Sequence, residues 1–445
     1  MSGIHPLHVA TSSKFPGVPL ILALPFDLEC AILDQVSNDF VALQACTLVC
    51  REWASIAQQR LFRSVLIDLE PVQGTTGDGQ SCDPTELQRF LDFLDGSPHL
   101  ARSVLTVTVH AGTIPSLAGF IRALLSKAPR LRALVLSMIT LDPDTISALP
   151  LLNAPTQSDI DGPSPGAAID MLELSWCEVN GARSLLDILR LFSRIRQITV
   201  FTSDGRSDID GSDVLDLRPS TVPVIESVVL NGVHSDLPAL LNSALRASFL
   251  PDGALQSIRV RLTHTPDLEG LLLPCLRGAH GRLRKLHLDL DRRLLLVVPL
   301  CTALESVTFA IEGKHQSRTP YMDYLRAVFP AYARLVCPPP PPLRSIMFKV
   351  QEGFQEYEDE GVREVLEAIA DGEHWRRLDA ELSAHRELAR FAFVFYNRPG
   401  HPGAEDKGRI VGTLERVLLR LVKRRILGVE LKPPPTDRQA LLYEI

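Results

Sequence analysis

The chain has 445 residues, of which 45% are hydrophobic and 22% are charged, and its formal net charge is −7. This composition is typical of a folded globular protein, and the length exceeds what one compact core usually organises, so we expect more than one domain. A net negative charge gives no general attraction for phosphate backbones, which argues against nucleic acid as the main partner.

The N-terminal segment predicts a small helical module. Residues 1–20 are predicted to be a disordered tail, whereas in PFDLECAILDQV the apolar residues recur at helical steps behind Pro25, a residue that a helix tolerates at its start. The following SNDF offers Ser37, Asn38 or Asp39 as a cap for a second helix, and LVCREWASIAQQRLF continues with a third. Three helices in about forty residues cannot bury much area alone, so the module must pack on the rest of the chain or on a partner.

From about residue 100 a pattern of the form apolar-x-x-apolar-x-apolar recurs. We find it as Val104/Val107/Val109, Leu131/Leu134/Leu136, Ile169/Leu172/Leu174, Ile195/Ile198/Val200, Ile225/Val228/Leu230, Leu255/Ile258/Val260, Leu283/Leu286/Leu288, Leu304/Val307/Phe309, Leu343/Ile346/Phe348 and Leu388/Phe391/Phe393. Helix-like segments such as SLAGFIRALLSKAP, ARSLLDILRLFSR and LPALLNSALRASF lie between these units. One short strand and one helix at this period are typical of a leucine-rich-repeat solenoid, and a compact α/β domain with evenly spaced units is the alternative. The predicted fold class is therefore α/β, with a three-helix module followed by an irregular solenoid of short parallel strands alternating with helices.

The C-terminal segment GRIVGTLERVLLRLVKRRILGVELKPPP predicts an amphipathic helix. Its apolar face carries Ile410, Leu414, Val417, Leu418 and Leu421, and its basic residues lie largely elsewhere. A basic amphipathic helix can bind a membrane surface or calmodulin. We favour the third interpretation, in which the helix caps the exposed end of the solenoid.

Two loops resemble a phosphate-binding loop and a calcium-binding loop, but each lacks residues that such a site requires. GTTGDGQS has no lysine where a phosphate-binding loop needs one. In SDGRSDIDGSD, placing Asp210 and Gly211 at the fifth and sixth positions of a calcium loop puts Arg206 at the first and Leu217 at the twelfth, where carboxylates are required. No H-E-x-x-H motif occurs. We expect a protein that is not an enzyme, with no catalytic residue, metal or cofactor.

The eight cysteines indicate a reducing compartment. They are scattered, with no C-x-x-C pair, whereas disulfide frameworks and zinc sites cluster their thiols. Cys46 and Cys50 are predicted to share one helix face, and Cys50 is predicted to be buried and inert because it lies in the apolar run LVCREW. The apolar run GVPLILALPF is too short to cross a membrane, and acidic residues follow it at once, so we expect no membrane span and no secretory signal. The expected location is the cytoplasm, the nucleus or both.

The segment LPFDLECAILDQVSNDFVALQACTLVCREWASIAQQRLF, Leu24 to Phe62, resembles an F-box. The match is an ordered set of residues: Leu24, Pro25, Ile32, Leu33, Asp39, Leu43, Leu48, Val49, Cys50, Arg51, Trp53, Ile56, Ala57, Leu61 and Phe62. An F-box followed by leucine-rich repeats is a recurring arrangement, and the whole chain resembles the F-box proteins common in mushroom-forming fungi. The corresponding domains are a tail (1–20), the F-box (21–65), a linker with the first helix of the repeat domain (66–99), the solenoid with its capping helix (100–432) and a tail (433–445).

The resemblance implies that the F-box binds a Skp-type adaptor, and through it the cullin of an SCF-type cullin–RING ubiquitin ligase. The residues expected to bind the adaptor are Leu24, Pro25, Ile32, Leu33, Leu43, Val49, Cys50 and Trp53. The chain would then be the non-catalytic substrate-recognition subunit, with neither nucleic acid nor membrane as a partner. A repeat scaffold whose F-box serves assembly without ubiquitin transfer is the alternative, and a hydrolase hidden in the repeats is a third.

An unknown protein substrate is expected on the strand positions that alternate with the apolar pattern. The candidate residues are Glu173, Phe201, Arg259, Arg261, Lys285, His287, Asp289 and Lys349. Among them Arg259, Arg261 and Lys285 would form a basic strip suited to an acidic or phosphorylated segment. The alternative is that these are ordinary solvated strand positions.

Overall fold

The structure, a computed structural model, divides into two compact units, Met1–Arg63 and Ser64–Ile445. The residues that it describes are 25–37, 39–69, 85–114, 117–141, 166–179, 185, 188–201, 223–231, 254–261, 276, 279–289, 301–312, 326, 328–329, 336, 339–351, 366–370, 373–396 and 404–432. No helix within these ranges is long and apolar enough to cross a membrane. We call the first unit the N-terminal module and the second the repeat unit.

The N-terminal module contains the three predicted helices, α1 (Phe26–Gln35), α2 (Phe40–Cys46) and α3 (Arg51–Leu61). Asp39 is the cap of α2, because its Oδ1 accepts a hydrogen bond of 2.9 Å from the backbone N–H of Ala42. This satisfies one of the donors that a helix leaves open at its start.

A turn separates α2 from α3, so one prediction about this region is wrong. Cys46 is the last residue of α2, whereas Cys50 precedes α3 as its N-cap, so the two thiols do not share a helix. The Sγ of Cys50 accepts from the backbone N–H of Trp53 at 3.5 Å. The predicted burial of Cys50 is also wrong, because a cap residue at the end of this turn is exposed.

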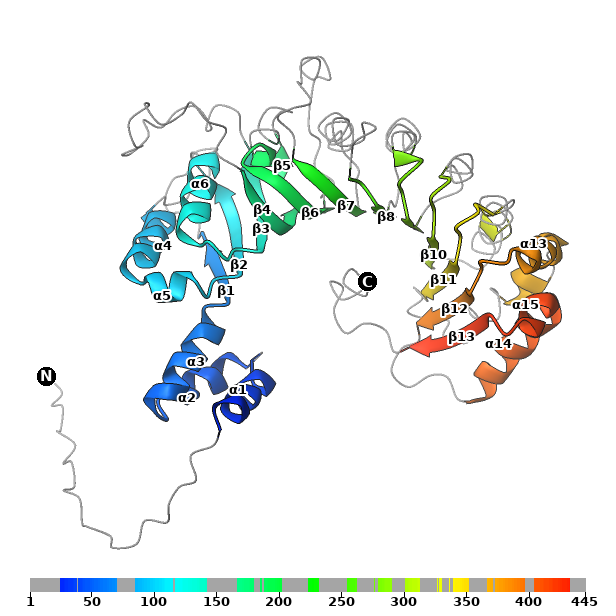
Figure 1. The fold of residues 1–445 in the computed structure, drawn as a ribbon, viewed down its shortest axis with the longest axis horizontal. Helices are drawn as coiled ribbons and strands as arrows, with labels where there is room; N and C mark the ends of the chain where they lie inside the picture. The colour runs from blue at the N-terminus through cyan, green and yellow to red at the C-terminus, as the bar shows by residue number, and fades with distance from the viewer. Residues whose placement is uncertain are drawn as a thin grey trace, which may run out of the picture. The chain divides into compact units, whose positions relative to one another are not determined.

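The repeat unit is built on a single parallel sheet (Figure 1). Twelve strands follow one another in the order β1-β2-β3-β4-β6-β7-β8-β9-β10-β11-β12-β13, and a thirteenth, β5 (Glu178–Val179), pairs with β3. Their bounds are β1 Ser64–Asp68, β2 Thr106–Thr113, β3 Ala133–Leu141, β4 Ala167–Ser175, β6 Phe192–Phe201, β7 Val224–Asn231, β8 Ser257–Arg261, β9 Lys285–Asp289, β10 Ser306–Glu312, β11 Ser345–Gln351, β12 Arg390–Tyr396 and β13 Leu427–Lys432. The order of the strands in the sheet is the order in the chain, which is the arrangement of a solenoid-like α/β fold.

The strand register confirms the repeated apolar pattern. Leu134 pairs with Leu172, Leu172 with Ile198, and the same position continues strand by strand to Phe391. The residues of all ten predicted units are buried in one continuous core. The sequence pattern missed the strands at the two ends of the path, β1 and β13, which pair with β2 and β12.

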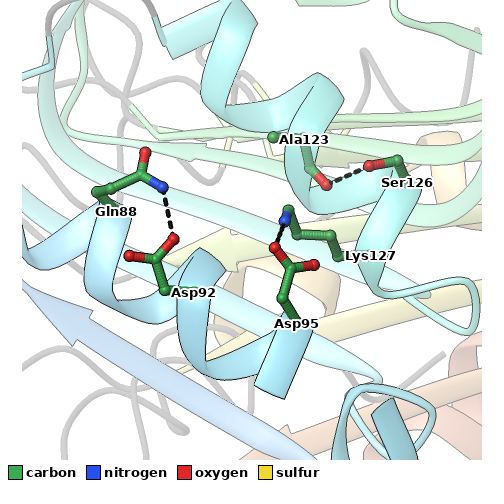
Figure 2. A network of polar contacts seen from close by, with 6 residues as sticks. All are labelled: Gln88, Asp92, Asp95, Ala123, Ser126 and Lys127. Carbon is green, nitrogen blue, oxygen red and sulfur yellow. Dashed lines mark hydrogen bonds and ion pairs between the residues drawn. The ribbon is translucent and has the colours of Figure 1, made fainter. Parts of the chain in front are cut away.

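At both ends of the sheet, helices pack on the face that carries these apolar rows. They are α4 (Thr85–Gly96), α5 (Pro98–Ala101) and α6 (Leu117–Lys127) at one end, and α13 (Glu373–Ala384), α14 (Ala404–Val417) and α15 (Leu419–Lys423) at the other. Near the amino end, α4 and α6 lie side by side, and Lys127 of α6 forms an ion pair with Asp95 of α4 (Figure 2). Within α4, Nε2 of Gln88 donates to Oδ1 of Asp92 at 2.7 Å. At these two ends, the core therefore lies between the sheet and a layer of helices.

The predicted C-terminal helix is in fact two helices followed by a strand. The helix breaks at Leu418, whose backbone is not helical, and the prediction of one helix is wrong from Leu427 onward, where β13 begins. The predicted apolar face is nevertheless buried through Ile410, Leu414 and Leu421. Because the chain's own core covers this face, it is not available to a membrane surface or to calmodulin.

The boundary between the two units lies slightly earlier than predicted. Ser64 and Val65, which were assigned to the N-terminal module, begin β1 of the sheet. The segment predicted as linker and first helix, 66–99, also contributes the rest of β1 and the helix α4 to the repeat unit.

Candidate docking surfaces

The N-terminal module exposes much of its apolar surface. Thirteen large hydrophobic side chains are exposed in the part of the chain that the structure describes, and seven of them belong to this module. They are Phe26, Leu28, Ile32, Phe40, Val41, Leu48 and Val49. Leu48 is 87% exposed and Val41 is 73% exposed. Concentrated apolar exposure of this kind marks a surface that another molecule covers.

The module's own core is correspondingly small. Its fully buried residues are Leu33, Leu43, Ile56 and Ala57, and the half-buried ring of Trp53 packs against them. Two of the predicted adaptor-binding residues, Leu33 and Leu43, therefore hold the helices together and do not face outward.

The other predicted adaptor-binding residues have different positions. Pro25, Ile32, Val49 and Cys50 are exposed, and Leu24 lies outside the described residues. Five exposed residues were missed: Phe26, Leu28, Phe40, Val41 and Leu48. The helical period does contain a signal for them, because successive residues point about 100° apart on a helix. Between Phe26 and Leu33 the apolar side chains point in more directions than one buried helix face can accommodate, so some of them must be exposed.

A groove of about 400 Å³ lies between α1 and α3. Its lining residues are Phe26, Cys30, Arg51, Glu52, Ser55, Ile56, Gln59 and Arg60. Nη2 of Arg60 lies 2.7 Å from Oδ1 of Asp34, and its Nε is buried without a hydrogen-bond partner. Among the exposed apolar residues, Phe26 thus lines a groove that also contains a partly unsatisfied cation.

The repeat unit offers a second surface, the face of the sheet opposite the core, which we call the open face. The structure brings several predicted substrate-binding residues together there. Arg259 pairs in register with His287, and Arg261 pairs with Asp289. Lys285 lies two positions before His287 on the same strand and is exposed. The side chains of Arg261 and Asp289 lie outside what the structure describes.

Other predicted residues of the open face are less accessible than expected. The prediction that Glu173 is accessible is wrong, because its side chain is only 3% exposed. Oγ of Ser175 donates a hydrogen bond of 2.6 Å to its Oε1. Phe201 is half-buried on the neighbouring strand. Nζ of Lys349 lies 6.0 Å from the centre of the Tyr396 ring, within range of a cation–π contact. The predicted residues therefore divide into a buried acidic position on β4 and basic positions on β8, β9 and β11.

A buried thiol links two successive strands, which sequence reasoning missed. Sγ of Cys177 donates to the backbone carbonyl of Leu136 at 3.3 Å. Burial raises the pKa of Cys177 to about 12, so that the thiol keeps the proton that it donates. The sequence does contain a signal for this thiol, because Cys177 stands three residues after Leu174, the last apolar residue of the unit Ile169/Leu172/Leu174.

One pair of side chains resembles part of a catalytic triad. Nδ1 of His110 and Oγ of Ser137 are 3.2 Å apart on β2 and β3, and Asp68 of β1 lies in the same register row. A triad also needs the carboxylate to orient the imidazole, but no hydrogen bond joins Asp68 to His110. Among the residues that the structure describes, no three His, Cys, Asp or Glu side chains gather as metal ligands.

No protein-family model matches the chain, and the curated proteins contain no significant match.

Proposed function

We propose that this chain is the substrate-recognition subunit of an SCF-type cullin–RING ubiquitin ligase. Its N-terminal module would be an F-box that binds a Skp-type adaptor, and its repeat unit would be a leucine-rich-repeat domain that binds a protein substrate. The chain would act by proximity in the cytoplasm or nucleus, holding the substrate where the catalytic subunits can reach its lysines.

One observation carries this proposal: the seven exposed apolar side chains of the N-terminal module. Burying a side chain such as Phe26 or Leu48 against a partner stabilises the complex by about 1.5–3 kcal/mol. Within its described residues the module buries only four apolar side chains in its core, so a partner would supply its remaining burial. The order of residues from Pro25 to Phe62 is that of an F-box, whose role is to bind an adaptor.

The repeat unit supports the leucine-rich-repeat assignment through Cys177. The repeat consensus L-x-x-L-x-L-x-x-N/C carries Asn or Cys at its ninth position. Ile169, Leu172, Leu174 and Cys177 fit this spacing, and the thiol of Cys177 bonds to the preceding strand through Leu136. A side-chain donor between successive strands is what this position of the repeat supplies.

The direct test is retention of the full-length chain on a purified Skp-type adaptor. We expect binding by the parent chain and loss of at least about tenfold in affinity for the triple variant Val41→Ser, Leu48→Ser, Val49→Ser. The matched control is Leu419→Ser, which changes an exposed apolar residue of the repeat unit and should bind like the parent. Equal retention of the triple variant and the parent would refute the F-box proposal.

Ubiquitin transfer separates the ligase subunit from the scaffold alternative. The assembly of chain, adaptor, cullin and RING protein is supplied with E1, E2 and ubiquitin, and modification of the chain itself is followed. A ligase subunit becomes ubiquitylated in a manner that the triple variant abolishes. Adaptor binding without any transfer would favour the scaffold.

A further inference from the structure

The carboxyl ends of three neighbouring strands share an unusual backbone conformation. Ala111, Met138 and Trp176 all have positive φ, at 62°, 56° and 60°. Each follows a residue of one register row, because His110 pairs with Ser137 and Ser137 with Ser175. The conformation is therefore repeated at the same place in three successive repeats.

This backbone conformation is costly for these residues. The left-handed region brings Cβ close to the following carbonyl, and glycine is the residue that adopts it without strain. Strain of this kind persists where the surrounding structure enforces it, and it gathers at functional sites. Here the residue with positive φ interrupts the alternation of the strand by one position, so that Ile139 and Cys177 are buried in the core.

The interruption also places two large side chains in solvent. Met138 is 56% exposed and Trp176 is 53% exposed, and each directly follows one member of the register pair Ser137 and Ser175. The other large apolar side chains of the neighbouring positions are buried, such as Leu136 and Leu174. We call Met138 and Trp176 the docking ridge.

The charge next to the docking ridge is negative. On β1 to β4, the positions that alternate with the core rows are Ser64, Leu66, Asp68, Thr106, Thr108, His110, Ala133, Val135, Ser137, Met171, Glu173 and Ser175. Among these positions Asp68 is the exposed carboxylate, because Glu173 is buried, and none is a lysine or an arginine. The aromatic ring of Trp176 and the exposed carboxylate of Asp68 are both groups that attract an ammonium or guanidinium.

We propose that the docking ridge and the adjoining open face of β1 to β4 bind an extended segment of the client protein that carries lysine or arginine. The segment's apolar side chains lie against Met138, a cationic side chain lies on the Trp176 ring, and a second one reaches Asp68. This inference rests on the proposed function, because it names the class of segment that the recognition subunit selects. It differs from the basic strip near Arg259, which suits acidic segments.

A display library of random twelve-residue peptides, selected on the full-length chain, tests the inference. The same library is selected on the double variant Met138→Ala, Trp176→Ala and on the control Leu419→Ala. We expect sequences of net positive charge that are enriched on the parent and on the control but not on the double variant. A synthetic copy of the best peptide should lose about tenfold in affinity for the double variant, and Asp68→Asn should weaken it by a smaller factor.

Two further variants separate a binding role from a structural one. Met138→Gly and Trp176→Gly keep the left-handed backbone but remove its strain, so we expect a higher midpoint of urea unfolding together with loss of peptide binding. A lower midpoint would show that the side chains serve packing, and it would overturn the inference. It would also be overturned by peptides that are net acidic, or by the absence of any peptide that depends on the ridge.

Retention on the Skp-type adaptor is measured for the same variants. Unchanged retention with lost peptide binding supports both the inference and the proposed function. Unchanged retention with unchanged peptide selection overturns the inference alone. A parent chain that fails to bind the adaptor refutes the proposed function, whatever the peptides show.

Discussion

The two ends of the described chain use apolar residues in opposite ways. The N-terminal module buries four residues and exposes seven large apolar side chains. At the other end, in residues 373–396 and 404–432, the strand residues Phe391, Phe393 and Phe395 are fully buried with Trp375, and only Leu419 is a large exposed apolar residue. This difference is what the proposed function predicts, because an adaptor would cover the first end, whereas the second buries its apolar residues in the chain's own core.

The C-terminal end also pairs many of its polar groups internally. At the C-terminal end the buried carboxylate of Asp379 accepts from the backbone N–H groups of Arg420 and Leu421, at 3.0 and 2.9 Å, and so caps α15. The guanidinium of Arg424 donates to five backbone carbonyls between residues 382 and 388. Each end nevertheless has one buried side-chain nitrogen without a hydrogen-bond partner, Nε of Arg60 in the N-terminal module and Nε1 of Trp375 at the C-terminal end. The contrast between the two ends therefore rests on their apolar exposure.

The largest effect should come from the aromatic cluster at the C-terminal end. The Phe348 ring is buried, with ring centres of Phe393 and Trp375 at 5.1 and 5.4 Å. Phe348→Ala should lower the free energy of unfolding by about 3–5 kcal/mol, because it leaves a cavity. Urea unfolding of the full-length chain measures this, with Leu419→Ala as the control that changes it by less than about 0.5 kcal/mol. A Phe348→Ala effect no larger than that of the control would contradict the contrast between the two ends.

The next effect concerns the cap of α15. Asp379→Ala removes the acceptor of two backbone donors, so the free energy of unfolding should fall by about 1–3 kcal/mol. The reference is Glu387→Ala, which removes an exposed carboxylate of the same region. The cap interpretation fails if the two substitutions have equal effects on the urea midpoint.

A smaller, pH-dependent effect should come from Cys177. Its pKa is about 12 in the folded chain and 9.0 as a free thiol. The unfolded chain therefore loses this proton first, so the thiol's contribution to stability is complete below pH 9 and declines as the pH rises toward 12. The decline is about 1.4 kcal/mol per pH unit. Parallel unfolding of the parent and Cys177→Ser between pH 8 and 10.5 measures it, since the difference in stability between the two should shrink above pH 9. If the difference in stability between the parent and Cys177→Ser stays constant across this pH range, the thiol ionises equally in the folded and unfolded chains, and its pKa is not raised by burial.

The smallest effect on stability should come from the exposed residues of the N-terminal module. The triple variant Val41→Ser, Leu48→Ser, Val49→Ser should change the free energy of unfolding by less than about 0.5 kcal/mol per site, because these side chains bury little in the free chain. Leu33→Ala, in the module's core, should instead cost about 2–5 kcal/mol of the module's stability. Circular dichroism and urea unfolding compare the two, and similar losses would mean that the exposed residues serve the module's own packing.

Much of the repeat unit could be predicted from the sequence, because one face of each strand is buried. The apolar-x-x-apolar-x-apolar spacing sets both the strand and its register, and ten units from Val104 to Phe393 lie in the core as predicted. β13 was missed because Arg424 stands where the pattern has its leading apolar residue. β1 fits the pattern as Phe62/Val65/Ile67, but it was missed because these residues were assigned to the N-terminal module and the linker. β13 also follows a helical pattern directly, which made one helix appear to continue through Leu427.

The candidate surfaces were less predictable, since a side chain's exposure depends on what packs beside it. The helical period groups Leu28, Ile32 and Leu33 together, but only Leu33 faces the core. Glu173 alternates with core residues as an exposed position should, yet Ser175 and its neighbours bury it. The positive φ of Met138 and Trp176 has no signal in the sequence, because neither is a glycine or an asparagine.

The most direct test of the docking role of the N-terminal module is amide hydrogen exchange of the full-length chain with and without a purified Skp-type adaptor. If the exposed apolar residues are the docking surface, the adaptor should slow exchange in peptides that cover residues 26–61 and leave peptides of the sheet between residues 64 and 432 unchanged. Protection confined to the sheet, or no protection anywhere under conditions that saturate the adaptor, would contradict the assignment of this module as the docking site.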